Sequence, residues 1–148
     1  MATILDIADA VVTELNGGSF SLSFTATRAY VPRFDLEEMA TLRVTVVPKG
    51  LEVTRGSRGR DQHDYRVDVG VQQKLARRGE FEQEDAAELD PLMGLVEEIA
   101  DHFRSLALET EPEAVCVAVE NGPVYAQEHV REGRLFTSVL TLTFRAWR

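Results

Sequence analysis

The segment "RGSRGRDQHD" at residues 55–64 concentrates side chains that commonly bind anions. Arg55, Arg58 and Arg60 are separated by small residues, and each guanidinium can donate paired hydrogen bonds to a phosphate or a carboxylate. The segment lacks the G-x-x-x-x-G-K-[ST] order of a P-loop, and a strand pattern follows where a phosphate site needs a helix N-terminus. Two interpretations therefore stay open: a solvated hairpin tip, or a contact surface for an acidic partner or passing nucleic acid.

Metal chemistry is the second possibility for this segment, because His63 lies close to Asp61 and Asp64. A metal site needs further ligands at a recognisable spacing, and His102 and His129 are far along the chain. We predict no metal and no cofactor, with His102 at the surface of a helix.

Nucleophilic and acid–base chemistry also lack support in the sequence. Cys116 is flanked by valines, which favours a buried small hydrophobic residue over a nucleophile in a basic, partly exposed setting. No serine occupies a nucleophile-elbow pattern. An acidic series indicates a solvated linker, because nothing isolates one carboxylate in an apolar pocket; it comprises Glu80, Glu82, Glu84, Asp85, Glu88 and Asp90. We predict that the protein is not an enzyme.

Composition limits the partners. The 148 residues favour one domain over residues 1–148, and 16 basic against 25 acidic side chains give a formal charge of −9. This charge argues against general affinity for nucleic acid or an anionic membrane. We expect no membrane span and no secretory signal, and the single cysteine is consistent with a reducing cytoplasm.

The first half of the chain predicts a helix and three strands. Residues 3–15 carry an apolar stripe at helical spacing, with Thr3 as N-cap and Asp6 completing a capping box. We expect Asn16, Gly17 and Gly18 to end this helix, with a glycine in the left-handed conformation. Residues 19–30 alternate as a half-buried strand.

Residues 41–54 and 65–74 also alternate, and they predict an antiparallel hairpin whose tip, residues 55–64, projects. Pro48 should stop or bend the first of these strands. Tyr65, Val67, Val69 and Val71 should share one face of the second strand.

The second half predicts one helix and two strands. Asp90 and Pro91 should open the helix after a charged bridge, and its apolar stripe comprises Leu92, Leu95, Val96, Ile99, Phe103 and Leu106. "AVCVAVE" indicates a mostly buried strand, and "LFTSVLTLTFRAW" a long strand with one apolar and one polar face. The predicted class is α+β, in the order α-β-β-β-α-β-β: a mainly antiparallel sheet of about five strands, with two helices on one face.

Four stretches resemble the tail terminator (tail-completion, minor tail) proteins of long-tailed bacteriophages and prophages. These are "VPRFDLEEMATLRVTVVPKG", "HDYRVDVGVQQKL", "DPLMGLVEEIADHFRSL" and "VYAQEHVREGRLFTSVLTLTFRAWR". The most specific parts are the V-x-V-V-P strand end, the D-Y-x-V-D-V-x-V-Q-x-K strand and the terminal "FTSVLTLTFRA". The resemblance covers nearly the whole chain.

The resemblance implies a structural virion protein that forms a hexameric ring on the head-proximal end of a finished tail tube. Such a ring stops tube polymerisation and provides the surface for head docking. Its partners would be further copies of itself, the major tail tube protein and a head-completion connector, and DNA would pass without specific binding. Assembly would take place in the bacterial cytoplasm.

We predict assembly contacts at Arg55, Arg58, Arg60, His63 and Asp64. Two alternatives to the tail terminator are kept. One is a head-closure or neck connector protein, and the other is a small nucleic-acid-binding module that uses the arginine-rich loop.

Overall fold

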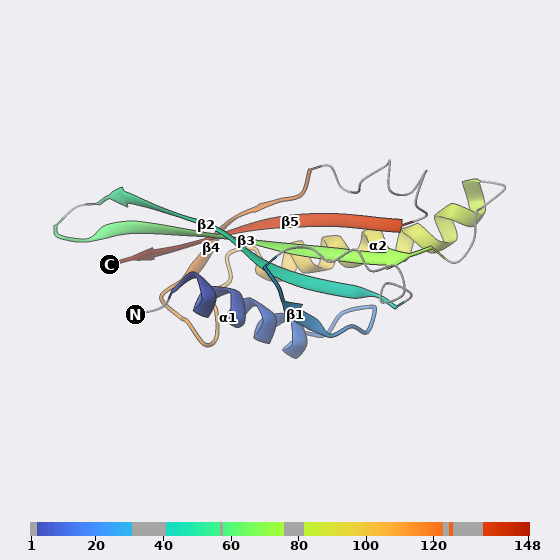
Figure 1. Cartoon of the computed structure of the whole chain (residues 1–148), viewed down its shortest axis with the longest axis horizontal. Helices are drawn as coiled ribbons and strands as arrows, with labels where there is room; N and C mark the ends of the chain where they lie inside the picture. Colours follow the sequence, from blue (N-terminus) through green and yellow to red (C-terminus); the bar gives the residue numbers. More distant parts are fainter. Residues whose placement is uncertain (1–2, 31–40, 57, 76–81, 123–124, 126–134) are drawn as a thin grey trace.

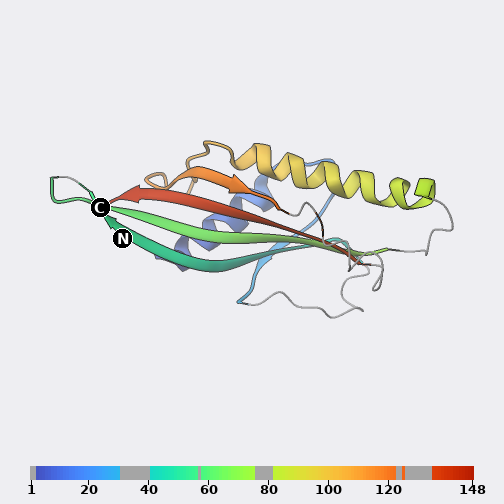
Figure 2. The same ribbon diagram turned by 90° about the horizontal axis from the view of Figure 1, so that it is seen from above.

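The computed structural model describes residues 3–30, 41–56, 58–75, 82–122, 125 and 135–148. Its elements follow the predicted order: α1 (Ile4–Gly17), β1 (Ala26–Arg28), β2 (Arg43–Arg55), β3 (Asp61–Lys74), α2 (Glu82–Phe103), β4 (Val115–Glu120) and β5 (Leu135–Trp147). The strands form one sheet in the spatial order β1-β2-β3-β5-β4 (Figures 1 and 2). Only β1 and β2 pair in parallel, so the predicted α+β class with a mainly antiparallel sheet is confirmed.

Both helices cover the same face of the sheet. Alternate residues of β2, β3 and β5 are buried in one cluster together with the apolar sides of α1 and α2. In β3 these residues are Tyr65, Val67, Val69 and Val71, as the alternation predicts. Phe103 of α2 meets Phe144 of β5 edge to face, with ring centroids 6.3 Å apart, at the centre of this core.

The predicted start of α1 and its predicted end at residues 16–18 are confirmed, whereas the left-handed glycine expected there is wrong. Thr3 Oγ1 accepts a hydrogen bond from the backbone N–H of Asp6, and the Asp6 carboxylate accepts one from the Thr3 N–H at 2.8 Å. At the other end the helix includes Gly17, and Gly18 is extended with a φ of −79°. A Cβ at Gly18 would lie 2.5 Å from the Phe20 ring, so this glycine permits a close approach and not a left-handed turn.

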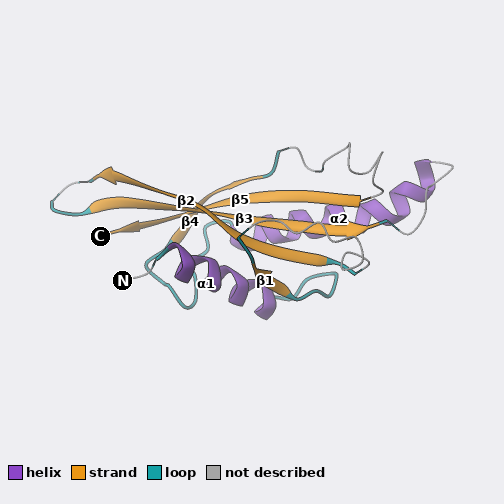
Figure 3. Cartoon of the chain, viewed as in Figure 1, coloured by secondary structure: helices purple, strands orange, loops and turns teal. Residues whose placement is uncertain are grey.

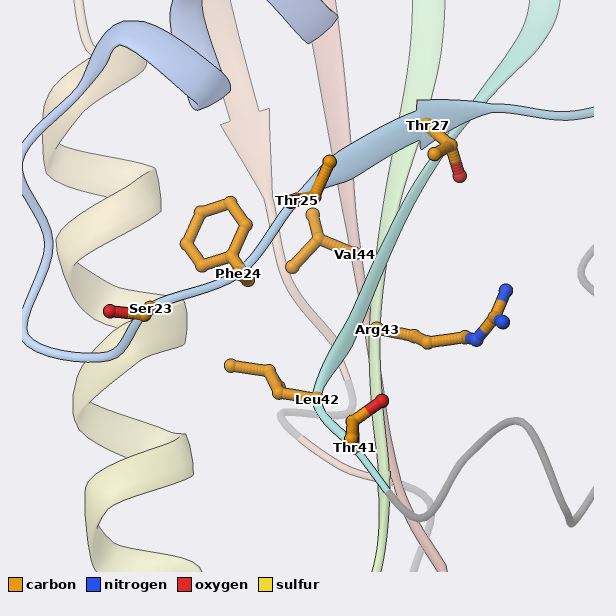
Figure 4. Close-up of a pocket in the computed structure, with 8 residues that line it drawn as sticks. All are labelled: Ser23, Phe24, Thr25, Thr27, Thr41, Leu42, Arg43 and Val44. Atoms are coloured by element: carbon orange, nitrogen blue, oxygen red, sulfur yellow. The ribbon is translucent and has the colours of Figure 1, made fainter.

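The predicted strand over residues 19–30 is largely wrong, because only β1 pairs with the sheet. The preceding residues form a loop (Figure 3), which runs beside α2 in the close-up of Figure 4. There the Glu98 carboxylate accepts hydrogen bonds from the backbone N–H and the hydroxyl of Ser21. Phe20 and Phe24 pack against the core from this loop, so the alternating apolar residues are buried without strand pairing.

The predicted start of α2 is also wrong. The helix begins at Glu82, inside the predicted charged bridge, and Pro91 lies within it. Proline has no N–H to donate to the preceding turn, so it is common in the first turn of a helix. Here it lies inside a 22-residue helix. The buried stripe from Leu92 to Phe103 is confirmed, whereas Leu106 lies beyond the helix and is half-buried.

The last two strands differ in how well the alternation predicts them. β5 alternates as predicted, with Phe136, Leu140, Leu142 and Phe144 buried. β4 is not mostly buried: its burial alternates, and a register shift between Cys116 and Ala118 places a bulge in an edge strand.

The packing of Phe103 gives a test of the core. Since this ring is fully buried, we expect Phe103→Ala to lower the free energy of unfolding by about 3–5 kcal/mol, measured by urea denaturation. Arg104→Ala, at an exposed neighbouring position, should change it by less than about 0.5 kcal/mol. Equal effects of the two substitutions would contradict the observed helix orientation.

Candidate assembly surface

The β2–β3 hairpin extends past the ends of both helices, and the C-terminus lies beside it (Figure 1). We call residues 51–64 the hairpin arm. On β2 every arm residue up to Arg55 is exposed. The end of β5 supports the arm on its other side, where Asp61 and Arg148 exchange backbone hydrogen bonds.

The turn at the end of the arm is shorter than the predicted connection. Strand pairing continues to Arg55 and Asp61, so residues 56–60 alone join the strands. Arg58 and Gly59 have φ values of 57° and 76°, the sign pattern of the type I′ turns that suit hairpin twist. A Cβ at Gly56 would lie 2.2 Å from the Arg60 carbonyl oxygen, so glycine is required there by a close backbone approach.

The three predicted contact arginines lie together at the tip of the arm. Arg55 ends β2, while Arg58 and Arg60 lie in the turn, and all three are exposed. Within the described part of the chain, none of them forms an ion pair. Their contact with a partner stays a prediction.

Asp64 and His63 differ from the arginines. Asp64 accepts two hydrogen bonds from Arg145 of β5, from Nε at 2.9 Å and from a terminal nitrogen at 3.2 Å. Arg145 therefore holds the pKa of Asp64 below its ordinary value, despite partial burial that acts in the opposite direction. Asp64 thus fastens the arm to β5 on the face away from the helices. His63 is half-buried on the helix-side face, with its ring near Tyr65.

The face away from the helices carries charges that neutralise one another. Arg66 pairs with Glu52 at 3.2 Å, and Lys49 lies 3.7 Å from Asp68. Asp68 also accepts a hydrogen bond from the Thr141 hydroxyl at 2.8 Å. These charged side chains therefore form cross-strand pairs, whereas the tip arginines form no ion pair with a described residue.

Sequence reasoning did not single out the apolar side chains of the arm. Leu51 and Val53 are 52% and 50% exposed on the helix-side face, and Trp147 is 52% exposed on the other. The alternation of "LEVT" predicts a strand. It does not predict that this strand extends past the helices (Figure 1), which leaves its apolar side chains exposed. Such exposed side chains on a projecting element are typical of an interaction surface.

Two hollows lie elsewhere on the sheet. One, of about 510 Å³, lies between β1 and the start of β2, with Phe24 and Leu42 beside it (Figure 4). A smaller hollow of about 120 Å³ lies over Gly70, on the face away from the helices, and is lined in part by Gln72 and Val139. The described residues that line the first hollow include no histidine, cysteine or carboxylate, so they offer no acid–base pair.

The remaining candidate residues occupy structural positions. His102 is half-buried on α2: its Nε2 lies 3.2 Å from Glu14, and its ring meets Phe20 and Phe103 edge to face. Cys116 is buried as predicted. His129, Glu80 and the side chains of residues 82–86 lie outside what the structure describes.

The described residues include no group of three or more histidine, cysteine, aspartate or glutamate side chains that could hold a metal ion. No helix in the described ranges is both long and apolar enough to span a membrane. In comparisons with known proteins, the sequence matches no family model and no curated protein.

The burial of Cys116 predicts slow thiol chemistry. Its side chain lies among core residues, and burial raises the pKa of the thiol. We expect a maleimide to label the native protein far more slowly than the urea-unfolded chain, followed by mass spectrometry. Equal labelling rates in the two states would contradict this position.

The Asp64–Arg145 pair predicts a pH dependence. Because the pKa of Asp64 is lowered by folding, the pair's stabilisation is complete above about pH 4 and is lost as the pH falls through the lowered value. Asp64→Asn should cost about 1 kcal/mol at pH 7 and less at about pH 3, measured by urea denaturation. Asp101→Asn, at an exposed position on α2, serves as the control. The same cost at both pH values would refute a role for the charge.

Proposed function

We propose that this protein is a structural subunit of the tail terminator type, which assembles as a ring on the end of a phage tail tube. The observation that carries the proposal is the hairpin arm. It combines three exposed arginines, which form no ion pair with a described residue, and two exposed apolar side chains on an element that extends beyond the helices. Folding alone gives no reason to extend this hairpin.

Charge supports contact between copies of this chain. Arginine forms forked hydrogen bonds with carboxylates, and the chain carries 25 acidic against 16 basic side chains. A second copy therefore offers many carboxylates to the tip arginines. In a closed ring, one surface of each subunit meets a different surface of the next, which suits a basic tip on an acidic body.

The sequence resemblance indicates where in the virion this assembly would form. Similarity to tail terminators implies a ring at the head-proximal end of the virion tail, formed in the bacterial cytoplasm. Its partners are the major tail tube protein and a head-completion connector. An acidic ring would also let DNA pass without binding, since a negative lining repels phosphate. A head-closure or neck connector is the nearest alternative within the same class.

One observation favours a different function. The exposed tip arginines and the nearby Trp147 ring could bind nucleic acid, since stacking and phosphate contacts often occur together. The two functions differ in their response to salt. Nucleic-acid binding through the arginines should weaken steeply as the salt concentration rises.

Replacing Arg55, Arg58 and Arg60 together by serine tests the proposal. The melting temperature should change by no more than a few degrees, because exposed charges contribute at most about 1 kcal/mol each. In a tail-assembly assay followed by electron microscopy, the variant should fail to terminate tubes or to join heads.

The matched control replaces three exposed cations away from the tip, Lys49, Lys74 and Arg104, by serine. It has the same net charge as the arginine variant and should terminate tails normally. Normal termination by the arginine variant would refute the assembly role of the tip. Salt-sensitive DNA binding that only the arginine variant loses would favour the nucleic-acid module instead.

A further inference from the structure

Along the arm, no strand among the described residues pairs with the outer edge of β2. β1 pairs with β2 only at residues 44–46, and the register of β2 then shifts between Pro48 and Gly50. Beyond this bulge, no described segment pairs with the side of β2 that faces away from β3. Native proteins usually protect such an edge, because its free backbone groups can pair with another chain.

The direction of the free backbone groups follows from the pairing of β3. Asp61 exchanges both backbone hydrogen bonds with Arg148, so the odd-numbered residues of β3 direct their N–H and C=O groups toward β5. The even-numbered residues direct theirs toward β2, where Asp64 and Gln62 face Glu52 and Thr54. On β2, the backbone groups of the alternate residues 51, 53 and 55 must therefore point away from β3.

Leu51, Val53 and Arg55 therefore present their backbone N–H and C=O groups at the open edge. No hydrogen bond to a described residue satisfies these groups. The same residues carry the exposed apolar side chains of the arm and the first of the tip arginines. This edge thus combines free backbone groups with apolar surface.

At the opposite edge of the sheet, residues 117–120 of β4 have no described segment on their outer side. Earlier in β4 the Cys116 N–H points outward and donates to the Leu106 carbonyl at 2.9 Å, which covers that part of the edge. Ala118 and Glu120 pair with β5, so Val119 directs its backbone groups outward. No described segment pairs with this edge beyond Cys116.

The two edges match in side-chain character. Among the described residues seven large hydrophobic side chains are exposed, and three of them lie on these edges: Leu51, Val53 and Val117. The charges at the two edges are opposite, since β2 ends in Arg55 and β4 ends in Glu120. Neither of these two residues forms an ion pair with a described residue.

We propose that residues 51–55 of one copy add to residues 117–120 of a second copy, so that the sheet continues across the subunit boundary. The contact joins two different surfaces, as ring closure requires, and it deepens the proposed function on which it rests. Strand addition satisfies the free backbone groups of both edges. The exposed leucine and valines then lose contact with water.

Mixed crosslinking tests which edges meet. In a Cys116→Ala background, one copy carries Val53→Cys and a second, tagged copy carries Val117→Cys. A short bifunctional maleimide should join tagged to untagged chains in the mixture, and should join neither variant efficiently to itself. Efficient self-crosslinking of the Val53→Cys chain would show a two-fold contact and overturn the proposal, as would the absence of crosslinks in the mixture.

A pair of proline substitutions tests the backbone groups themselves. Val53→Pro removes an N–H at the open edge, where proline is tolerated, so the melting temperature should stay close to that of the parent. Thr54→Pro removes an N–H that points toward β3, so it should lower the melting temperature. Introduced into the untagged Cys116→Ala chain next to a crosslinkable Leu51→Cys, Val53→Pro should abolish the mixed crosslink that Leu51→Cys alone gives. Retained crosslinking in a folded Val53→Pro chain would overturn strand addition.

These results separate the interface from the proposed function. Mixed crosslinks together with normal tail termination by the tip-arginine variant would support the edge contact and refute the role of the tip. Absent crosslinks together with failed termination by that variant would refute the edge contact alone.

Discussion

The antiparallel ladder between β3 and β5 is the constraint on which the rest of the structure depends. It pairs residues from Gln62 with Trp147 to Lys74 with Leu135, and it continues beyond the helices. Along its inner part, one face is buried by α1 and α2, which fixes the register because a slip by one residue would expose the core side chains. Along its outer part the same ladder carries the hairpin arm, where no helix covers the sheet. The register set by the core therefore also decides which arm residues are exposed.

The outer part of the ladder has to hold its geometry with polar contacts. Asp64 and Arg145 join β3 to β5 with two hydrogen bonds, and Glu52 and Arg66 join β2 to β3. Because these pairs use the charges along the strands, the cations left over gather at the tip. The arm is thus held by its own cross-strand pairs, while its edge and its tip stay available for contact. This division of roles is the physical basis of the proposed ring.

Some features of this fold follow directly from local sequence patterns. The β3 and β5 alternation predicts the buried face, and Thr3 with Asp6 predicts the start of α1, because each signal depends on neighbouring residues alone. The wrong predictions concern segments whose conformation depends on contacts with residues far away in the sequence. The stretch before β1 alternates like a strand, yet Glu98 of α2 binds Ser21 and holds it in a loop. The arginine-rich tip could be recognised from the sequence, whereas the open edges of β2 and β4 depend on strand order and on where the helices end.

The oligomeric state across a range of concentrations and salt tests the central claim most directly. Light scattering coupled to gel filtration should show a closed assembly of six copies, six times the 16.5 kDa of the chain, as the resemblance to tail terminators implies. The tip-arginine variant should remain a folded monomer under the same conditions. A parent chain that stays monomeric at every concentration and binds DNA in a salt-sensitive way would contradict the account.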